Sequence, residues 1–394
     1  MRIIGIIAEY NPLHYGHEYQ LKLAKETFNA DAVVVVMSGN FTQRGTPAIL
    51  DKNIRAELAI KAGADLVVEL PSYYSSGILD DFALGAVSIL DKLGCVDCIL
   101  FGSELGKIDS LTGIARAMYD DTYTYQVIRE GMRNKLTIDA ANKTLLRRYA
   151  NSHEQYLEMI DAINKPNNML GIFYIIALLR LNSDIIPITN MRKGQNFEDD
   201  SIHMSKSKEK NYVSATAIRK YVNSGAFLKE EVDWFLKSSP DYTRIELEKA
   251  NRDNRIIPCD AMWKLFMRKI RSQGFSSLNG IVDITDDCKD RIREGLLSSN
   301  TYDDFISVAA KGLRSSAKID RCIVHYVLNH SADALDGFKN DKVTYYIRVL
   351  ACNNVGREIF GEQTLPIPSD YMASLQYQND QLADNVYITL FQNV

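Results

Sequence analysis

The fold is decided by the stretch IIGIIA (residues 3–8) and by the loop EYNPLHYGH (residues 9–17) that follows it. A six-residue apolar run with no polar alternation is typical of a strand that is covered on both faces. The loop after it is polar, and apolar residues at helical spacing continue to about residue 28. This order of strand, polar loop and helix predicts the first half of a βαβ unit.

The same rhythm continues through the first half of the chain. Short apolar runs alternate with helical patterns, and VVVV (residues 33–36) is again apolar at every position. Such runs predict an α/β fold in which helices flank both faces of a doubly wound, Rossmann-like parallel sheet. The predicted strands cover residues 3–8, 32–37, 66–70, 98–101 and 184–188, and the first predicted helices cover about 16–28, 51–62 and 79–93.

The chain is too long for one core, because single cores stop growing near ~250–300 residues and this chain has 394. From about residue 225 helical spacing dominates, as in AMWKLFM (residues 261–267), while the strand-like TYYIRV (residues 344–349) stands alone. We therefore expect two domains, one with the sheet over residues 1–224 and a mainly helical one over residues 225–394.

Composition limits the classes of function. Hydrophobic residues make up 46% and charged residues 24% of the chain, and no apolar run approaches the ~18 residues that suggest a membrane span. Six scattered cysteines favour free thiols in a reducing compartment, so we expect a cytoplasmic protein without membrane contact. The net charge is −4, so a nucleic-acid partner would require a local basic patch.

The loop after the first strand carries the strongest functional signal. Ligands of open α/β sheets bind beyond the carboxyl ends of strands, and this loop places His14 and His17, with Gly16 between them, at a predicted helix start. Two imidazoles, the backbone N–H groups and the helix dipole together suit a triphosphate. The alternative is that the histidines only cap the helix.

A second polar cluster lies in VSATAIR (residues 213–219). Ser214 and Thr216 offer hydroxyls at a helix start, and Arg219 follows about one turn later. This arrangement suits the β- and γ-phosphate oxygens of a nucleotide. The alternative is an ordinary helix N-cap.

Together the two clusters resemble the HxGH and ISSTxxR elements of nucleotidyltransferases. The chain also resembles the bacterial tRNA-Met cytidine acetate ligase family. Leu13 stands where that family usually has Phe and Tyr15 where it often has Asn, but both histidines are kept. The stretches that carry the resemblance are GIIAEYNPLHYGH (5–17), MSGNFTQRGTPAI (37–49), GADLVVELP (63–71), FGSE (101–104), KPNNMLG (165–171) and RKG (192–194).

The resemblance implies a two-step reaction. Acetate attacks the α-phosphate of ATP to give acetyl-adenylate, and N4 of the wobble cytidine of elongator tRNA-Met then takes the acetyl group. The resemblance implies catalytic roles for His14, His17 and Arg219. The ATP contacts that it implies are Ile7, Ala8, Glu9, Tyr10, Asn11, Pro12, His14, Gly16, His17, Gln20, Gly102, Asn167, Arg192, Lys193, Ser214 and Thr216.

Several of these residues also have an ordinary structural interpretation. Gly102 lets a backbone come close to adenosine, or else it marks a strand-to-loop turn. Asn167 follows a proline at a helix start and is a natural N-cap. The pair Arg192–Lys193 also fits a solvated turn.

Two basic features are candidates for tRNA contact. Arg44 follows the second strand and could reach either a phosphate of ATP or the tRNA. Lys311, Arg314, Lys318 and Arg321 recur at three- and four-residue spacings, so one helix would align them in a phosphate-binding stripe. The alternative for the stripe is a solvated helical face.

We therefore predict an ATP-dependent acetate ligase whose partners are acetate, ATP and elongator tRNA-Met. Two other functions stay open: adenylyl transfer to a small phosphorylated metabolite, and a nucleotide-binding RNA factor without turnover. The large second domain favours a macromolecular substrate. No metal site of the protein's own is predicted, and whether ATP brings Mg²⁺ with it is left open.

Overall fold

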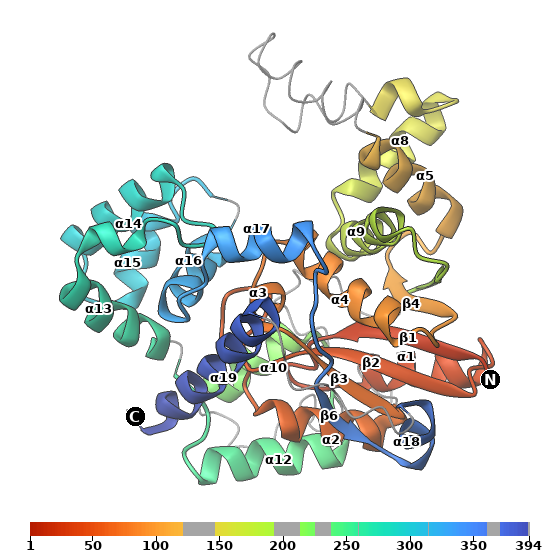
Figure 1. Cartoon of the computed structure of the whole chain (residues 1–394), viewed down its shortest axis with the longest axis horizontal. Coiled ribbons are helices and arrows are strands. Elements are labelled where there is room, and N and C mark those ends of the chain that lie inside the picture. Colours follow the sequence, from red (N-terminus) through yellow and green to blue (C-terminus); the bar gives the residue numbers. More distant parts are fainter. Residues whose placement is uncertain are drawn as a thin grey trace, which may run out of the picture.

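A six-stranded sheet lies at the centre of the structure (Figure 1). The computed structural model describes residues 1–120, 146–192, 213–224, 238–258, 260–313, 315–360 and 371–392. The strands are β1 (Ile3–Ala8), β2 (Ala32–Ser38), β3 (Leu66–Leu70), β4 (Cys98–Ser103), β5 (Ile186–Met191) and β6 (Val349–Cys352). Their order is β5-β4-β1-β2-β3-β6. The five predicted strands form and are parallel, which confirms the predicted sheet.

The sheet opens between β1 and β4. β1 pairs with β2 at all six of its residues, whereas its pairing with β4 stops at Gly5. After β1 the chain adds β2 and β3 on one side and then β4 and β5 on the other. The carboxyl ends of β1 and β4 therefore border the switch point beyond which open α/β sheets bind ligands.

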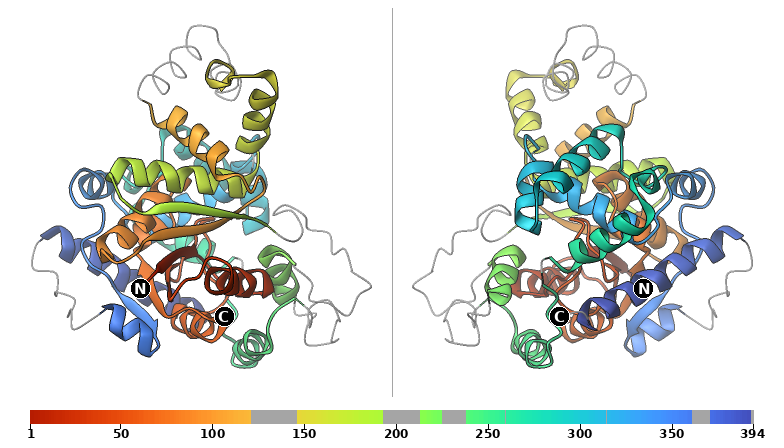
Figure 2. Two further views of the ribbon diagram at one scale, coloured as in Figure 1. Left: turned by 90° about the vertical axis from the view of Figure 1, so that its right-hand side faces the viewer. Right: turned by 90° about the vertical axis from the view of Figure 1, so that its left-hand side faces the viewer.

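Helices cover both faces of the sheet, because alternate residues of a strand pack into different cores. In β2, Val33 and Val35 pack into one core and Val34 and Val36 into the other. Figure 2 shows α1 and α9 on opposite faces. The first face carries α1 (Tyr15–Glu26), α2 (Lys52–Ala62), α10 (Ala215–Asn223) and α12 (Asp241–Arg252); the second carries α3 (Ser72–Ser75), α4 (Leu79–Leu93), α5 (Ile108–Tyr119), α8 (His153–Ile163) and α9 (Pro166–Leu181).

A third core belongs mainly to the helices on the left of Figure 1. Trp263 stacks on Phe305 there with ring centroids 4.3 Å apart. Phe41, from the loop after β2, packs into the same core. The helices are α13 (Ala261–Gln273), η2 (Phe275–Leu278), α14 (Asp286–Ser298), α15 (Tyr302–Ala309) and α16 (Ala317–Val327). The prediction of a mainly helical second part is confirmed.

The last part of the chain returns to the sheet through α17 (Ala332–Asn340), β6, α18 (Asn354–Phe360) and α19 (Tyr371–Gln392). The expectation of an isolated strand at residues 344–349 is wrong. The strand forms at Val349–Cys352 and pairs antiparallel with β3, because the edge of β3 would otherwise leave backbone groups unpaired. The division of the chain at residue 224 stays a prediction. Among the described helices, none combines the length and apolar character needed to cross a bilayer.

Candidate nucleotide-binding site

The loop after β1 is tied to the loop after β2. The Glu9 carboxylate accepts a hydrogen bond from the Gln43 N–H at 2.9 Å, and the Asn11 side-chain oxygen accepts one from the Ile49 N–H at 2.8 Å. Tyr10 between them is buried, has a φ of 46°, and its hydroxyl has no hydrogen-bond partner within the described ranges. Glu9 and Asn11, both predicted ATP contacts, thus fix the shape of the loop.

A buried arginine that sequence analysis missed holds these loops from beneath. The Arg55 guanidinium is inaccessible to solvent and donates to four backbone carbonyl oxygens. Its partners are Glu9 O at 2.6 Å, Ser38 O at 3.0 Å, Leu50 O at 2.9 Å and Gly39 O. One guanidinium therefore joins the carboxyl ends of β1 and β2.

His14 and His17 cap helix α1 with their rings. The Gly16 N–H donates to His14 Nδ1 at 3.0 Å, and the His14 N–H donates to His17 Nδ1 at 3.3 Å. A ring nitrogen that accepts carries no proton, so the proton of each neutral ring lies on Nε2. The rings stack with centroids 3.8 Å apart, which brings two N–H donors close together.

Both rings are held neutral. Burial, with the nearby Arg192 and Arg219 guanidinium groups acting in the same direction, lowers the pKa of His14 to about 3. Burial also holds the pKa of His17 well below its ordinary value, with His14 and Arg192 acting in the same direction. The positive charge of the site therefore comes from arginines, while the imidazoles supply neutral N–H donors.

Arg219 brings the second sequence cluster to the first. Helix α10 begins after Ser214, whose hydroxyl accepts from the Ala217 N–H at 3.2 Å, as the N-cap interpretation holds. Arg219 donates to Asn11 O at 2.6 Å and to Thr216 Oγ1 at 3.2 Å. The two clusters, far apart in sequence, therefore meet at the histidine loop.

On the other side of the opening, Glu104 organises a network that the sequence predicted only in part. Its carboxylate accepts from the N–H groups of Asn167 (3.3 Å) and Asn168 (2.8 Å) at the start of α9. It also accepts from Asn167 Nδ2 at 2.6 Å. The donor end of the Asn167 amide thus faces Glu104, and its acceptor end receives Arg192 Nη1 at 2.6 Å. Glu104 orients Asn167, and Asn167 in turn holds Arg192.

The remaining predicted ATP contacts that the structure describes lie around the same strand ends. Gln20 Nε2 donates to Leu100 O at 3.3 Å. A Cβ on Gly102 would lie 2.9 Å from Arg192 Cγ, so this glycine makes room for the arginine. Ile7 and Ala8 end β1 half-buried, Pro12 is buried, and Lys193 lies outside the described residues.

The predicted tRNA stripe is not one helix. α15 ends at Ala309 and α16 begins at Ala317, because Gly312 with a φ of 80° turns the chain between them. Lys311 lies on that turn, and Arg314 lies outside the described residues.

The cations on α16 have carboxylate neighbours. Lys318 lies 3.8 Å from Asp287, and Arg321 Nε donates to Asp283 at 2.8 Å. Arg44 is half-buried in the loop after β2. A role in tRNA binding for the stripe residues and for Arg44 stays a prediction.

The protein's own side chains offer no metal site in the described part of the chain. No three His, Cys, Asp or Glu residues there lie close enough together to hold an ion.

Comparison with known proteins gives one consistent result. The profile of the HIGH Nucleotidyl Transferase family matches residues 1–394. The tRNA(Met) cytidine acetate ligase of Thermoanaerobacter sp. (strain X514) is 32% identical, with 100% of this chain and 96% of the relative covered. That of Clostridium novyi (strain NT) is 34% identical over 99% and 94% of the two chains.

Solved structures agree. Thermotoga maritima TmcAL bound with alpha-thio ATP superposes with a TM-score of 0.85 at 28% identity, covering 99% of this chain and 95% of that one. Its apo form gives a TM-score of 0.87 over the same shares. The chain therefore belongs to the HIGH nucleotidyl transferase family and, within it, to the family of the tRNA(Met) cytidine acetate ligases.

Proposed function

We propose that this protein joins acetate to the α-phosphate of ATP and passes the acetyl group to N4 of the wobble cytidine of elongator tRNA-Met. The observation that carries the proposal is the convergence of two neutral imidazoles and two arginines at the opening between β1 and β4. Family membership supports the same activity. ATP is the co-substrate.

The first step would form one bond and break one. A carboxylate oxygen of acetate attacks the α-phosphorus of ATP, the bond from that phosphorus to the bridging oxygen breaks, and pyrophosphate leaves with the electron pair. Such a transfer depends on in-line positioning and on stabilising the charge that develops. In this proposal the Nε2–H groups of His14 and His17, with Arg219, bind the departing phosphates.

In the second step the N4 amine of cytidine attacks the acyl carbon, and AMP leaves with the electron pair of its bond to that carbon. The amine loses one proton in the process. The chain's part in this step is to hold the adenylate and exclude water, so that the amine and not water reaches the acyl carbon.

The test measures both steps on the purified protein. In the absence of tRNA, the protein should release pyrophosphate from ATP when acetate is added and should release none when acetate is left out. With radiolabelled acetate and unmodified tRNA-Met, label should enter the tRNA, and a tRNA-Met with uridine at the wobble position should take none. Pyrophosphate release that depends on a phosphorylated metabolite would instead establish adenylyl transfer, and nucleotide binding without turnover would establish a non-catalytic factor.

A further inference from the structure

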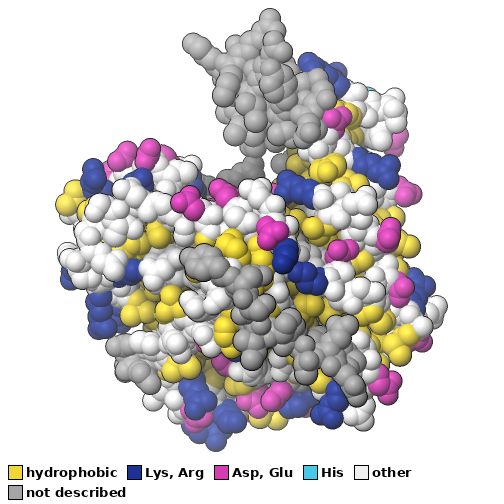
Figure 3. All heavy atoms as spheres, in the orientation of Figure 1, with side chains coloured by type: hydrophobic (Ala, Val, Ile, Leu, Met, Phe, Trp, Pro, Cys, Tyr) yellow, Lys and Arg dark blue, Asp and Glu magenta, His cyan; other side chains and the backbone are white. Residues whose placement is uncertain are grey.

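The helices of the third core, α13 to α16, are called the helical unit here, and α13 is the most basic of them. Residues 261–273 contain Lys264, Arg268, Lys269 and Arg271 and no Asp or Glu, in a chain whose net charge is −4. Lys264, Arg268 and Arg271 are exposed, because the apolar side of the helix packs into the third core. In Figure 3 dark-blue side chains gather at the left edge, where Figure 1 places α13.

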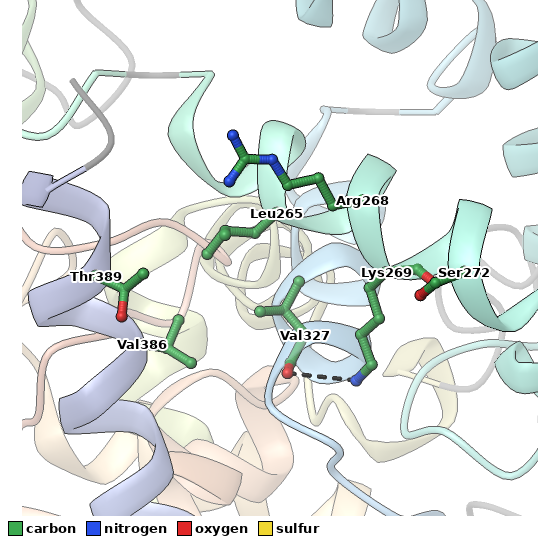
Figure 4. A pocket seen from close by; sticks show the side chains of 7 residues that line it. All are labelled: Leu265, Arg268, Lys269, Ser272, Val327, Val386 and Thr389. Atoms are coloured by element: carbon green, nitrogen blue, oxygen red, sulfur yellow. Dashed lines mark hydrogen bonds between the residues drawn. The ribbon is translucent and has the colours of Figure 1, made fainter.

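An open groove runs beside this basic surface, between α13, α16 and α19 (Figure 4). Its volume is about 340 Å³, near the lower end of the ~300–1,000 Å³ range of small-ligand sites. Its lining is mostly apolar, with cations on the α13 side and no carboxylate. The lining residues are Leu265, Arg268, Lys269, Ser272, Val327, Val386 and Thr389.

Lys269 fixes one wall of the groove. Its ammonium donates to Tyr326 O, to Val327 O at 3.4 Å and to the Asn329 side-chain oxygen at 2.6 Å. These carbonyls end α16, where a cation is favoured by the helix dipole. Lys269 therefore binds the end of α16, and Arg268 is the exposed cation among the lining residues.

The surroundings of α13 differ from those of the predicted stripe. Lys318 and Arg321 face Asp287 and Asp283. The first turns of α14 and α15 carry three further aspartates, Asp286, Asp303 and Asp304. Carboxylates repel phosphate and hold the cations that would bind it. Residues 261–273 and the groove lining contain no acidic residue, although Asp260, which precedes the helix, pairs with Lys264 at 3.0 Å.

We propose that α13 and the adjacent groove form the RNA-docking surface for the tRNA substrate, with Arg268 and Arg271 on backbone phosphates and a single unstacked base in the groove. This inference rests on the proposed function for the identity of the RNA. Guanidinium groups bind phosphate oxygens in pairs. Proteins hold unpaired RNA bases by contact with the flat faces of the bases, and here Leu265, Val327 and Val386 would cover one such face.

The first experiment reverses the two arginines. The double variant Arg268→Glu with Arg271→Glu should bind unmodified tRNA-Met ~10-fold or more weakly, and the log-log slope of affinity against salt should become shallower by roughly 1.4–1.8 for two lost contacts. The matched control, Lys61→Glu with Lys249→Glu, makes the same charge change at exposed residues of α2 and α12. It should change the slope little. A melting curve confirms that each variant is folded.

A second variant tests the groove. Thr389→Trp fills it from the α19 side without changing charge, so tRNA affinity should fall while the salt slope stays the same. If the affinity of Thr389→Trp for tRNA is unchanged, the groove does not hold a base and that part of the proposal is wrong. The rival pair, Lys311→Glu with Lys318→Glu, should weaken binding less than the α13 pair. Normal tRNA binding by the α13 pair, or a larger loss from the rival pair, overturns the proposed surface.

Acetate-dependent pyrophosphate release, measured without tRNA on the wild-type preparation, separates the two proposals. If the wild type releases none but binds tRNA through α13, the proposed activity fails and the docking surface stands. If the wild type acetylates tRNA-Met and the α13 pair binds it normally, only the docking surface fails.

Discussion

At the scale of single residues, the rings of His14 and His17 both cap helix α1 and offer N–H donors to the site. Helices usually begin with Ser, Thr, Asp or Asn as the capping acceptor; here His14 and His17 supply the acceptors of a capping box. Each ring uses Nδ1 for the cap and is left with Nε2–H as a donor. The structural and functional interpretations of these histidines are therefore compatible, because different ring nitrogens serve them.

This arrangement predicts the protonation state of the site. His14 has a pKa of about 3 and that of His17 is lowered as well, so both rings should remain neutral with the proton on Nε2 from pH 8 to pH 5. Long-range ¹H–¹⁵N spectra of the histidine rings, assigned with His14→Gln and His17→Gln, report the tautomer directly. Titration of either ring with a midpoint near 6.5 would contradict the assignment.

Loss of one imidazole should be costly for the first chemical step. His17→Ala removes a preorganised donor and should lower the rate of acetyl-adenylate formation by about 10² or more. The rate is measured as acetate-dependent pyrophosphate release, with a melting curve to confirm the fold. Near-normal turnover by a folded variant would exclude the assigned role.

Glu104 should act on ATP binding through Asn167 and Arg192. Glu104→Gln keeps the shape but replaces one acceptor by a donor, so the Asn167 amide can turn and release Arg192. KM for ATP should rise by about tenfold with little change in kcat. The matched control Glu158→Gln removes a carboxylate that pairs with Lys107 between α8 and α5. Equal effects of the two variants would mean that Glu104 only stabilises the fold.

At the scale of elements, the loop after β2 depends on close contact with α16. Gly45 has a φ of 76°, and a Cβ there would collide with the backbone of Asp320 and Arg321. Gly94 has a similar φ of 67° at the end of α4, but a Cβ there would meet nothing within 4 Å. The pair of glycines thus separates the contribution of backbone conformation from that of contact.

Gly45→Ala should therefore destabilise the protein by about 1–3 kcal/mol more than Gly94→Ala, the usual range for overpacking. Both variants share the strain of a positive φ, so the difference in their unfolding free energies measures the contact between the loop and α16. Denaturant unfolding curves give that difference. Equal losses would show that the loop shifts away from α16 at little cost.

The sequence predicted the elements that depend on local pattern. Continuous apolar runs predicted five strands of the sheet, and the clusters around His14 and Arg219 predicted residues that the fold brings together. The misses depend on tertiary contacts. Arg55 lies among charged residues of a helical pattern, and nothing in the sequence shows that its guanidinium is buried under strand ends. The turn at Gly312 was missed because cation spacing alone suggested one helix.

At the scale of the whole molecule, helix α19 is joined to the sheet and to α2 by buried ion pairs. Asp384 of α19 pairs with Lys52 at 2.5 Å and with Arg348 at 3.0 Å. Lys52 is almost wholly buried and also pairs with Glu69 at 2.7 Å. Arg348 also lies 3.3 Å from Glu69, so removing one member would take one of two partners from each opposite charge. Residues at opposite ends of the sequence therefore depend on each other.

The helical unit and the sheet meet at a second buried polar group. The Ser72 hydroxyl of α3 lies 3.2 Å from His330 Nε2, and His330 Nδ1 lies 2.8 Å from His325 Nδ1. Tyr73 stacks on the His330 ring with centroids 4.1 Å apart. Both histidines are fully buried, so the junction excludes the water that would solvate a charged ring.

This junction predicts how the whole molecule responds to acid. Burial lowers the pKa of His325 to about 4, although Asp283 nearby acts in the opposite direction; in the unfolded chain it is ~6.5. Below pH 6.5 the unfolded state therefore takes up a proton that the folded state does not, and stability falls as pH falls from 6.5 to 4.

Replacing His325 with glutamine should make the dependence of unfolding free energy on pH shallower by about 1 kcal/mol per pH unit between pH 6 and 5. The carboxylates that also titrate are common to both proteins, so they largely cancel in the difference between slopes. His153→Gln, at an exposed site, controls for loss of a histidine as such. Equal slopes for wild type and the His325 variant would show that the junction accepts the proton without opening.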